Sequence, residues 1–193
     1  MSPSNDQSSL LSLTQLENLM RAGGTQRFHT WAGELLKTQD VAQHVYGLMW
    51  LVLALTHNTA SRNLLIATIH HDAGERWVGD MPSPTKRIMP GLRDALHEAE
   101  ADALAARGGV RAPELSGFDD LVLGLADALD GVFFCGRELA MGNRRILPVF
   151  ENFLEYANSA HVALKEAYPG PLYAKDLVDN ILCIFSKLGE NND

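Results

Sequence analysis

The sequence predicts an all-α fold, and two observations lead to that expectation. Apolar residues recur at helical spacing along most of the chain, and no stretch alternates with the period of two that a half-buried strand would show. The chain has 193 residues, 46% of them apolar, which suits one compact domain with a sizeable core. We therefore expect a single helical bundle.

The helices can be placed in order from their apolar stripes and end signals. The first carries leucines at positions 10, 11, 13, 16 and 19 and ends at a Gly-Gly pair. Asp40 is a suitable N-cap for the second helix, and Gly79 closes the third. The prolines and glycine of "MPSPTKRIMPG" predict a loop. The predicted helices span 10–22, 41–57, 62–77, 92–107, 118–141, 148–168 and 173–188.

Charge, termini and cysteines narrow the class of protein. The net charge of −8 argues against a surface that coats a nucleic-acid polymer, but it leaves room for a small anionic substrate. Residues 1–9 are polar and form an expected tail before a domain at 10–193, and the longest apolar run, 45–55, is too short to span a bilayer. Cys135 and Cys183 are expected to be buried, reduced thiols. We expect a cytoplasmic protein, in the host cytoplasm if phage-encoded.

The stretch "IHHDAGERWVGDMPSP" at 69–84 concentrates histidines and acids directly after an apolar run. Burying an unpaired carboxylate is costly, so such acids normally have a partner or a metal. His71 and Glu75 are four residues apart and would share one face of the predicted helix, with Asp72 beside them. Asp80 follows Gly79 and is free to point back at the same place. This spacing predicts a polar site at the end of the helix.

Two residues on other helices are candidates to complete a metal shell. His44 lies on an otherwise apolar helix, and Asp127 lies in "LGLADALDG". Either residue alone would have an ordinary structural explanation, as a core histidine or a capped carboxylate. Together with His71 and Asp72 they give two imidazoles and two carboxylates, which suit Zn²⁺, Mn²⁺, Fe²⁺, Co²⁺ or Ni²⁺. Such an ion can bind a phosphoryl oxygen and lower the pKa of water.

These motifs, in this order, resemble the HD-domain phosphohydrolases, a family named for its metal-binding His-Asp pair. "HHDAGERWVGDMPSPTK" is similar to the "HDxxE…GDxPxPxK" signature of the YfbR-type 5′-deoxynucleotidases. "DVAQHVYGLMWLVLAL" resembles their "VxEH" helix, with Gln43 where Glu is usual, and "ADALDGVFFCGRELAMGN" resembles their "ADAL…EELAxGN" helix. The resemblance covers roughly residues 26–145 and implies an HD-domain helical bundle.

The resemblance implies four metal ligands. His44, His71, Asp72 and Asp127 match the family's ligand positions. Asp130 is a nearby competitor, but Asp127 is the acid in the matching "ADAL" and is preferred. The implied cofactor is a divalent transition metal such as Zn²⁺, Co²⁺ or Mn²⁺.

The resemblance also implies catalytic and substrate-binding residues. Glu75 and Asp80 match the two acids that position the attacking water and manage its proton, and they could hold a second ion such as Mg²⁺. Arg27 would contact sugar or phosphate, and Phe28 would stack on the base, with core packing as the alternative for Phe28. Lys86, after "PSP", would neutralise phosphate charge.

The implied reaction is hydrolysis of the 5′-phosphate group or groups of a deoxynucleotide. The bacterial family members act on monophosphates, whereas phage proteins of the DatZ type remove triphosphate from dATP. "RAGGTQRFHT" is more similar to the phage type, so we expect a dATP-like triphosphohydrolase. The alternatives are a 5′-deoxynucleotidase acting on monophosphates and a non-catalytic nucleotide-binding scaffold. The expected partners are the deoxynucleotide and further copies of the chain, in a homo-oligomer, with no nucleic-acid polymer and no membrane.

Overall fold

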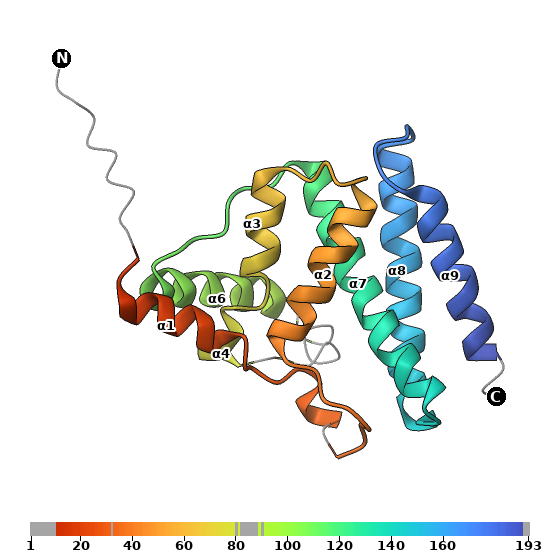
Figure 1. Cartoon of the computed structure of the whole chain (residues 1–193), viewed down its shortest axis with the longest axis horizontal. Coiled ribbons are helices and arrows are strands. Elements are labelled where there is room, and N and C mark those ends of the chain that lie inside the picture. Colours follow the sequence, from red (N-terminus) through yellow and green to blue (C-terminus); the bar gives the residue numbers. More distant parts are fainter. Residues whose placement is uncertain (1–10, 32, 80, 82–88, 90, 191–193) are drawn as a thin grey trace.

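The computed structural model describes residues 11–31, 33–79, 81, 89 and 91–190 (Figure 1). Across these residues the chain is helical, with no strand beyond an isolated bridge between Gln26 and Asp40, which confirms the all-α prediction. The tail predicted at 1–9 lies outside the described residues, and so does most of the loop predicted at 81–91. The helices are α1 (Leu13–Ala22), η1 (His29–Trp31), α2 (Val41–Leu55), α3 (Arg62–His70), α4 (Glu75–Val78), α6 (Leu92–Gly108), α7 (Gly117–Ala140), η2 (Arg144–Ile146), α8 (Leu147–Ala167) and α9 (Lys175–Glu190).

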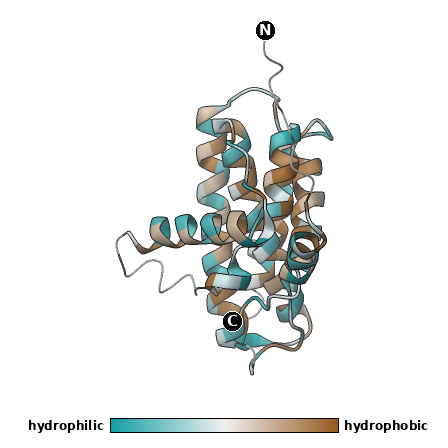
Figure 2. Ribbon diagram, turned by 90° about the vertical axis from the view of Figure 1, so that its left-hand side faces the viewer, coloured by the Kyte–Doolittle hydropathy of each residue, from teal (hydrophilic) through white to brown (hydrophobic). Residues whose placement is uncertain are grey.

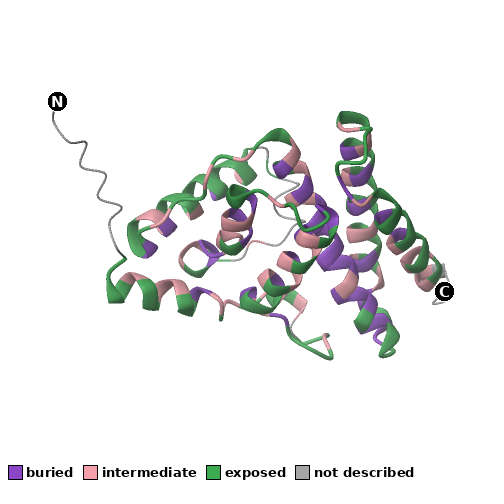
Figure 3. Cartoon of the chain, turned by 45° about the horizontal axis from the view of Figure 1, so that its top comes forward, coloured by how far each residue is buried: buried purple, intermediate pink, exposed green. Residues whose placement is uncertain are grey.

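Helix α7 lies at the centre of the packing. It contacts α2, α3, α8 and α9, and Figure 3 shows buried residues concentrated along it. Hydrophobic and hydrophilic residues alternate around the helices in Figure 2, as expected when each helix turns one face to a common core. A smaller cluster of Ala22, Ala73 and Leu104 joins α1 and α6 to the residues before α4. The core therefore holds α2 and α7 in direct contact, and these two helices carry much of the site described below.

The start of α2 follows the capping prediction. The Asp40 carboxylate accepts a hydrogen bond from the backbone N–H of Gln43, and the Gln43 side chain accepts one from the backbone N–H of Asp40. This reciprocal capping box satisfies two donors that a helix start would otherwise leave without partners. It fixes the first turn of α2, and with it the direction of His44.

The helix predicted over 62–77 is wrong as a continuous element. Helix α3 ends at His70, His71 is its C-cap, and α4 begins only at Glu75. The break occurs because Asp72 has φ of 59°, in the left-handed region, which a right-handed helix cannot contain. His71 and Glu75 are therefore not placed by a shared helix face. The turn between the two helices sets their positions instead.

One of the two cysteine predictions is also wrong. Cys135 is buried on α7, whereas Cys183 on α9 is exposed. Leu182 and Val178 turn inward on α9, and Cys183 follows Leu182 by one residue, about 100° further round the helix. Among the described helices, none combines the length and apolar character needed to cross a membrane.

Candidate metal centre

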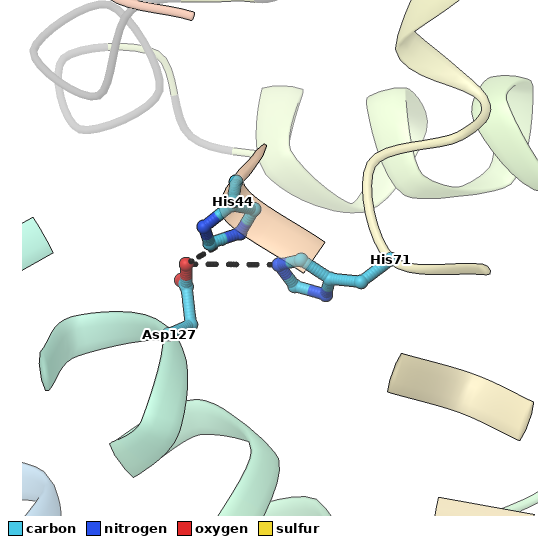
Figure 4. Close-up of side chains that lie close together, drawn as sticks. All are labelled: His44, His71 and Asp127. Atoms are coloured by element: carbon cyan, nitrogen blue, oxygen red, sulfur yellow. Dashed lines mark ion pairs between the residues drawn. The ribbon is translucent and has the colours of Figure 1, made fainter. Parts of the chain in front are cut away.

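Three side chains from separate parts of the sequence converge beside α7. His44 projects from α2, His71 from the turn after α3, and Asp127 from α7 (Figure 4). One potential ligand atom from each lies within 4.8 Å of the other two. Asp127 Oδ1 is 3.4 Å from His44 Nε2 and 3.6 Å from His71 Nε2. The structure thus brings together three of the four predicted metal ligands in one compact group.

Asp72 lies beside both imidazoles through different oxygens. Its Oδ2 is 3.5 Å from His44 Nε2, and its Oδ1 is 3.3 Å from His71 Nε2. Two ligands that bind a tetrahedral ion at about 2.0–2.1 Å are about 3.3–3.4 Å from each other. The donor separations in this group, 3.3–3.6 Å, are close to that edge length. The spacing of His44, His71 and Asp127 therefore suits a small, nitrogen- and oxygen-bound cation, and Asp72 lies beside that group.

Two buried atoms of this group have no hydrogen-bond partner. They are Nε2 of His44, whose side chain is fully buried, and Oδ1 of Asp127. Leaving a buried polar atom without a partner costs about 1–3 kcal/mol, so such atoms normally mark a missing ligand, water or ion. Both atoms face each other across the same gap, which is where a cation would satisfy them together.

The charge around the group also favours a cation. The Asp72, Asp127, Asp130 and Glu75 carboxylates surround the guanidinium of Arg27, and together they raise its pKa although burial acts in the opposite direction. The closest approaches of the guanidinium are 3.6 Å to Asp72, 3.6 Å to Asp127 and 3.5 Å to Asp130. Negative charge exceeds positive charge here, and a divalent ion would offset the difference.

The protonation states of the group follow from the same charges. Burial alone would lower the pKa of His71, but Asp72 and Asp127 raise it to about 9. Burial alone would raise the pKa of both carboxyls, but His71 and Arg27 hold the pKa of each below its ordinary value. In the metal-free protein at neutral pH the two acids are therefore ionised and His71 carries a proton.

The other predicted residues fall in different surroundings. Glu75 is buried at the start of α4, and its backbone N–H bonds to the Asp72 carbonyl at 3.1 Å. Phe28, at φ of 54°, stacks on Phe134 with ring centroids 4.7 Å apart, so core packing occupies one of its faces. The Arg27 Cζ lies 5.4 Å from the centre of the Phe28 ring. Asp80 and Lys86 lie outside the described residues.

Two supporting residues were not predicted from the sequence. The buried Glu138 carboxylate accepts hydrogen bonds from the backbone N–H groups of Leu36 and Lys37 and from the Asn143 amide, at 2.7–2.9 Å. It fastens the segment after η1 to the end of α7, and its signal in the sequence was the "ELAMGN" motif, to which no role had been given. Gln39 is buried between Arg27 and α7 and had no signal beyond its place before the cap.

A hollow of about 480 Å³ adjoins His71 on the side of α3 and α6. Its lining combines apolar residues such as Ala67, Leu115 and Leu123 with the imidazoles of His70, His71 and His97 and the carboxylate of Asp120. Burial lowers the pKa of His70, which keeps that ring neutral near pH 7. The hollow is of the size that takes a small organic ligand.

Comparison with known proteins identifies the family. The sequence profile of the family described as 5′-deoxynucleotidase YfbR-like matches residues 10–107, slightly more than half of the chain. The chain belongs to the YfbR-like 5′-deoxynucleotidase family. The family description favours the nucleotidase alternative over the triphosphohydrolase that the sequence analysis preferred. A search among curated proteins found no match.

The profile match ends before α7. His44, His71, Asp72 and Glu75 fall inside it, and Asp127 falls outside. The place of Asp127 in the group therefore rests on the fold, which puts α7 against α2 and brings this carboxylate to His44.

Proposed function

We propose that the protein is a divalent-metal-dependent 5′-deoxynucleotidase, which hydrolyses deoxynucleoside 5′-monophosphates to deoxynucleoside and phosphate. The proposal rests on the convergence of two imidazoles and a carboxylate in a chain of the YfbR-like 5′-deoxynucleotidase family. Two buried atoms of these side chains, His44 Nε2 and Asp127 Oδ1, have no hydrogen-bond partner. A triphosphate substrate has no comparable support.

His44, His71, Asp72 and Asp127 are the residues that would hold the ion. The mixed set of nitrogen and oxygen donors favours Zn²⁺, Co²⁺ or Mn²⁺ over Ca²⁺. An ion bound there supplies Lewis acidity to a phosphoryl oxygen and lowers the pKa of water towards neutrality.

The remaining steps fall to the chain's own side chains. Water adds to phosphorus, the bond from phosphorus to the 5′-oxygen breaks, and a proton from the water ends on the released hydroxyl. We assign the orientation of that water and the handling of its proton to Glu75, whose buried carboxylate lies near enough to Arg27 to raise the pKa of the guanidinium. Asp80 is proposed as its partner in that role.

Arg27 is proposed to bind the substrate phosphate. Its guanidinium lies 3.6 Å from both Asp72 and Asp127. A planar guanidinium at this place could donate two parallel hydrogen bonds to a phosphate. Phe28 follows Arg27 directly and is proposed to contact the base with the part of its ring that core packing leaves free. Lys86 is proposed as a further positive charge for the phosphate.

Product analysis tests the proposal. Metal-free protein would be reloaded with Zn²⁺, Co²⁺ or Mn²⁺ and incubated with dAMP and with dATP. We expect phosphate from dAMP and no product from dATP. Triphosphate released from dATP would establish the triphosphohydrolase instead, and nucleotide binding without turnover would establish the non-catalytic scaffold.

Two variants separate the proposed roles. Glu75→Gln should keep the ion and lose most turnover, because only the orientation and proton of the water are affected. Asp127→Asn should lose ion and turnover together. Glu98→Gln, at an exposed position on α6, is the matched control and should change neither. Equal loss of metal in the Glu75 and Asp127 variants would contradict the division of roles.

A further inference from the structure

Asp130 lies on α7, three residues after Asp127, and faces the other side of the same imidazole. Asp127 Oδ1 is 3.4 Å from Nε2 of His44, whereas Asp130 Oδ2 is 2.7 Å from Nδ1. Positions three apart lie on one helix face, so α7 brackets the ring with one carboxylate at each nitrogen. Asp130 is directed away from the gap where a cation would lie, which makes it a poor candidate for a ligand.

We infer that Asp130 is a positioning residue, which fixes the tautomer of His44 and holds Arg27 beside the metal centre. A carboxylate can only accept a hydrogen bond, so the proton of the neutral ring must be on Nδ1. The lone pair of Nε2 is then left facing Asp127 and Asp72, as binding of a cation requires. Metal-bound histidines commonly have such a carboxylate behind them.

The contacts of Asp130 converge on a single oxygen. Its Oδ2 accepts from His44 Nδ1 at 2.7 Å and from Gln39 Nε2 at 2.9 Å, and it lies 3.5 Å from Arg27 Nη1. Arg27 Nη1 in turn donates to Gln39 Oε1 at 3.0 Å, which closes a ring of polar contacts. Because Asp130 is 7% exposed, this network is shielded from water and its geometry is well defined.

The second oxygen of Asp130 explains a glycine on α2. Gly47 lies one turn after His44, and a Cβ at this position would collide with Asp130 Oδ1. The missing side chain lets α2 and α7 approach until the carboxylate reaches the ring. Any larger residue at 47 would displace Asp130 from His44, although it would remove no charged group from the site.

The test uses Asp130→Asn in the full-length protein, without nucleotide. The amide can donate to Nδ1, which favours the tautomer with the proton on Nε2 and blocks the cation. We expect ¹⁵N NMR of the metal-free protein to show the His44 proton move from Nδ1 to Nε2. We expect Zn²⁺ affinity, from competition with a chelator, to fall roughly 10- to 100-fold.

Asp119→Asn is the matched control. Asp119 is also a buried acid of α7, and it accepts a hydrogen bond from the Ser61 hydroxyl at 2.8 Å. Within the described part of the chain it makes no contact with the metal centre. Its amide variant alters only the contact with Ser61 and should leave the His44 tautomer and the Zn²⁺ affinity unchanged. If Asp130→Asn does not fold, Gly47→Ala moves the carboxylate without removing its charge and should weaken Zn²⁺ binding in the same direction.

The inference would be overturned if Asp130→Asn and Gly47→Ala bound Zn²⁺ as tightly as the wild type. It would also be overturned if His44 of the wild-type protein carried no proton on Nδ1. The part that concerns Arg27 rests on the proposed function, whereas the tautomer does not. Both measurements are made without nucleotide. Failure to hydrolyse dAMP would therefore refute the proposed nucleotidase activity. The role of Asp130 would still be decided by the NMR and Zn²⁺-affinity measurements.

Discussion

Metal binding should depend steeply on pH, because a proton on His71 competes with the ion. The neighbouring acids raise the pKa of His71 to about 9 in the metal-free protein, so at pH 7 the ring is almost entirely protonated. The ion binds the neutral ring and must release that proton. From pH 7 to about 9 the affinity should rise about tenfold per unit, in total about 100-fold or ~2.7 kcal/mol at 1.36 kcal/mol per unit.

Two measurements check this dependence. Chelator competition from pH 6.5 to 9.5 should give a slope near one that flattens above the pKa of His71. Calorimetry in buffers of different ionisation enthalpy should count about one proton released from this ring at pH 7. His57→Gln, which removes an exposed histidine, should leave the slope unchanged. A Zn²⁺ affinity that is flat between pH 7 and 8.5 would refute the reasoning.

The stability of the metal-free protein should change in the opposite direction. A pKa raised by folding means that the protonated ring stabilises the folded state, fully below the unfolded pKa of about 6.5. That contribution is lost as pH rises through the folded pKa of about 9. Thermal melting of chelator-treated protein should therefore shift to lower temperature over this interval.

Three further changes test particular contacts. Phe28→Ala should raise KM for dAMP with little change in kcat, because it removes a stacking contact worth about 1–3 kcal/mol of binding free energy. Leu123→Trp, which fills the hollow beside His71, should leave KM unchanged. The reverse pattern would put the base in the hollow. Glu138→Gln should lower the free energy of unfolding, measured in urea, by about 1.5–3 kcal/mol, because its charge-assisted hydrogen bonds weaken. An unchanged urea midpoint would contradict the role of that carboxylate. A thiol reagent should modify Cys183 in the native protein but Cys135 only after unfolding, because Cys135 is buried and burial raises its pKa to about 12. Modification of both cysteines in the native protein would contradict this prediction.

Helix ends were predictable where a local side chain sets them. Asp40 caps α2 as predicted, and α6, predicted to end at 107, ends at Gly108 with the left-handed Gly109 as its C-cap. Both signals act within one turn of the backbone, so a sequence shows them without any knowledge of the fold. The family motifs likewise pointed to the residues that converge at the centre.

Features set by packing between distant segments were not predictable in this way. Spacing suggested that His71 and Glu75 share a helix face, but the left-handed Asp72 divides the helix between them. Asp130 looked like an alternative to Asp127, because only the approach of α2 shows which side of the imidazole each acid faces. Phe28 could not be assigned until its partner Phe134, far along the chain, was known.

The contact between α2 and α7 has a consequence for how related proteins can diverge. His44 and the two acids that bracket it belong to these two helices, which are part of the core and cannot slide past one another without disrupting it. Segments such as 25–37 and 110–117 join the helices without carrying these three residues. Insertions there would leave the two helices of the proposed metal site in contact, so new substrate preferences in this lineage should arise first in those connecting segments.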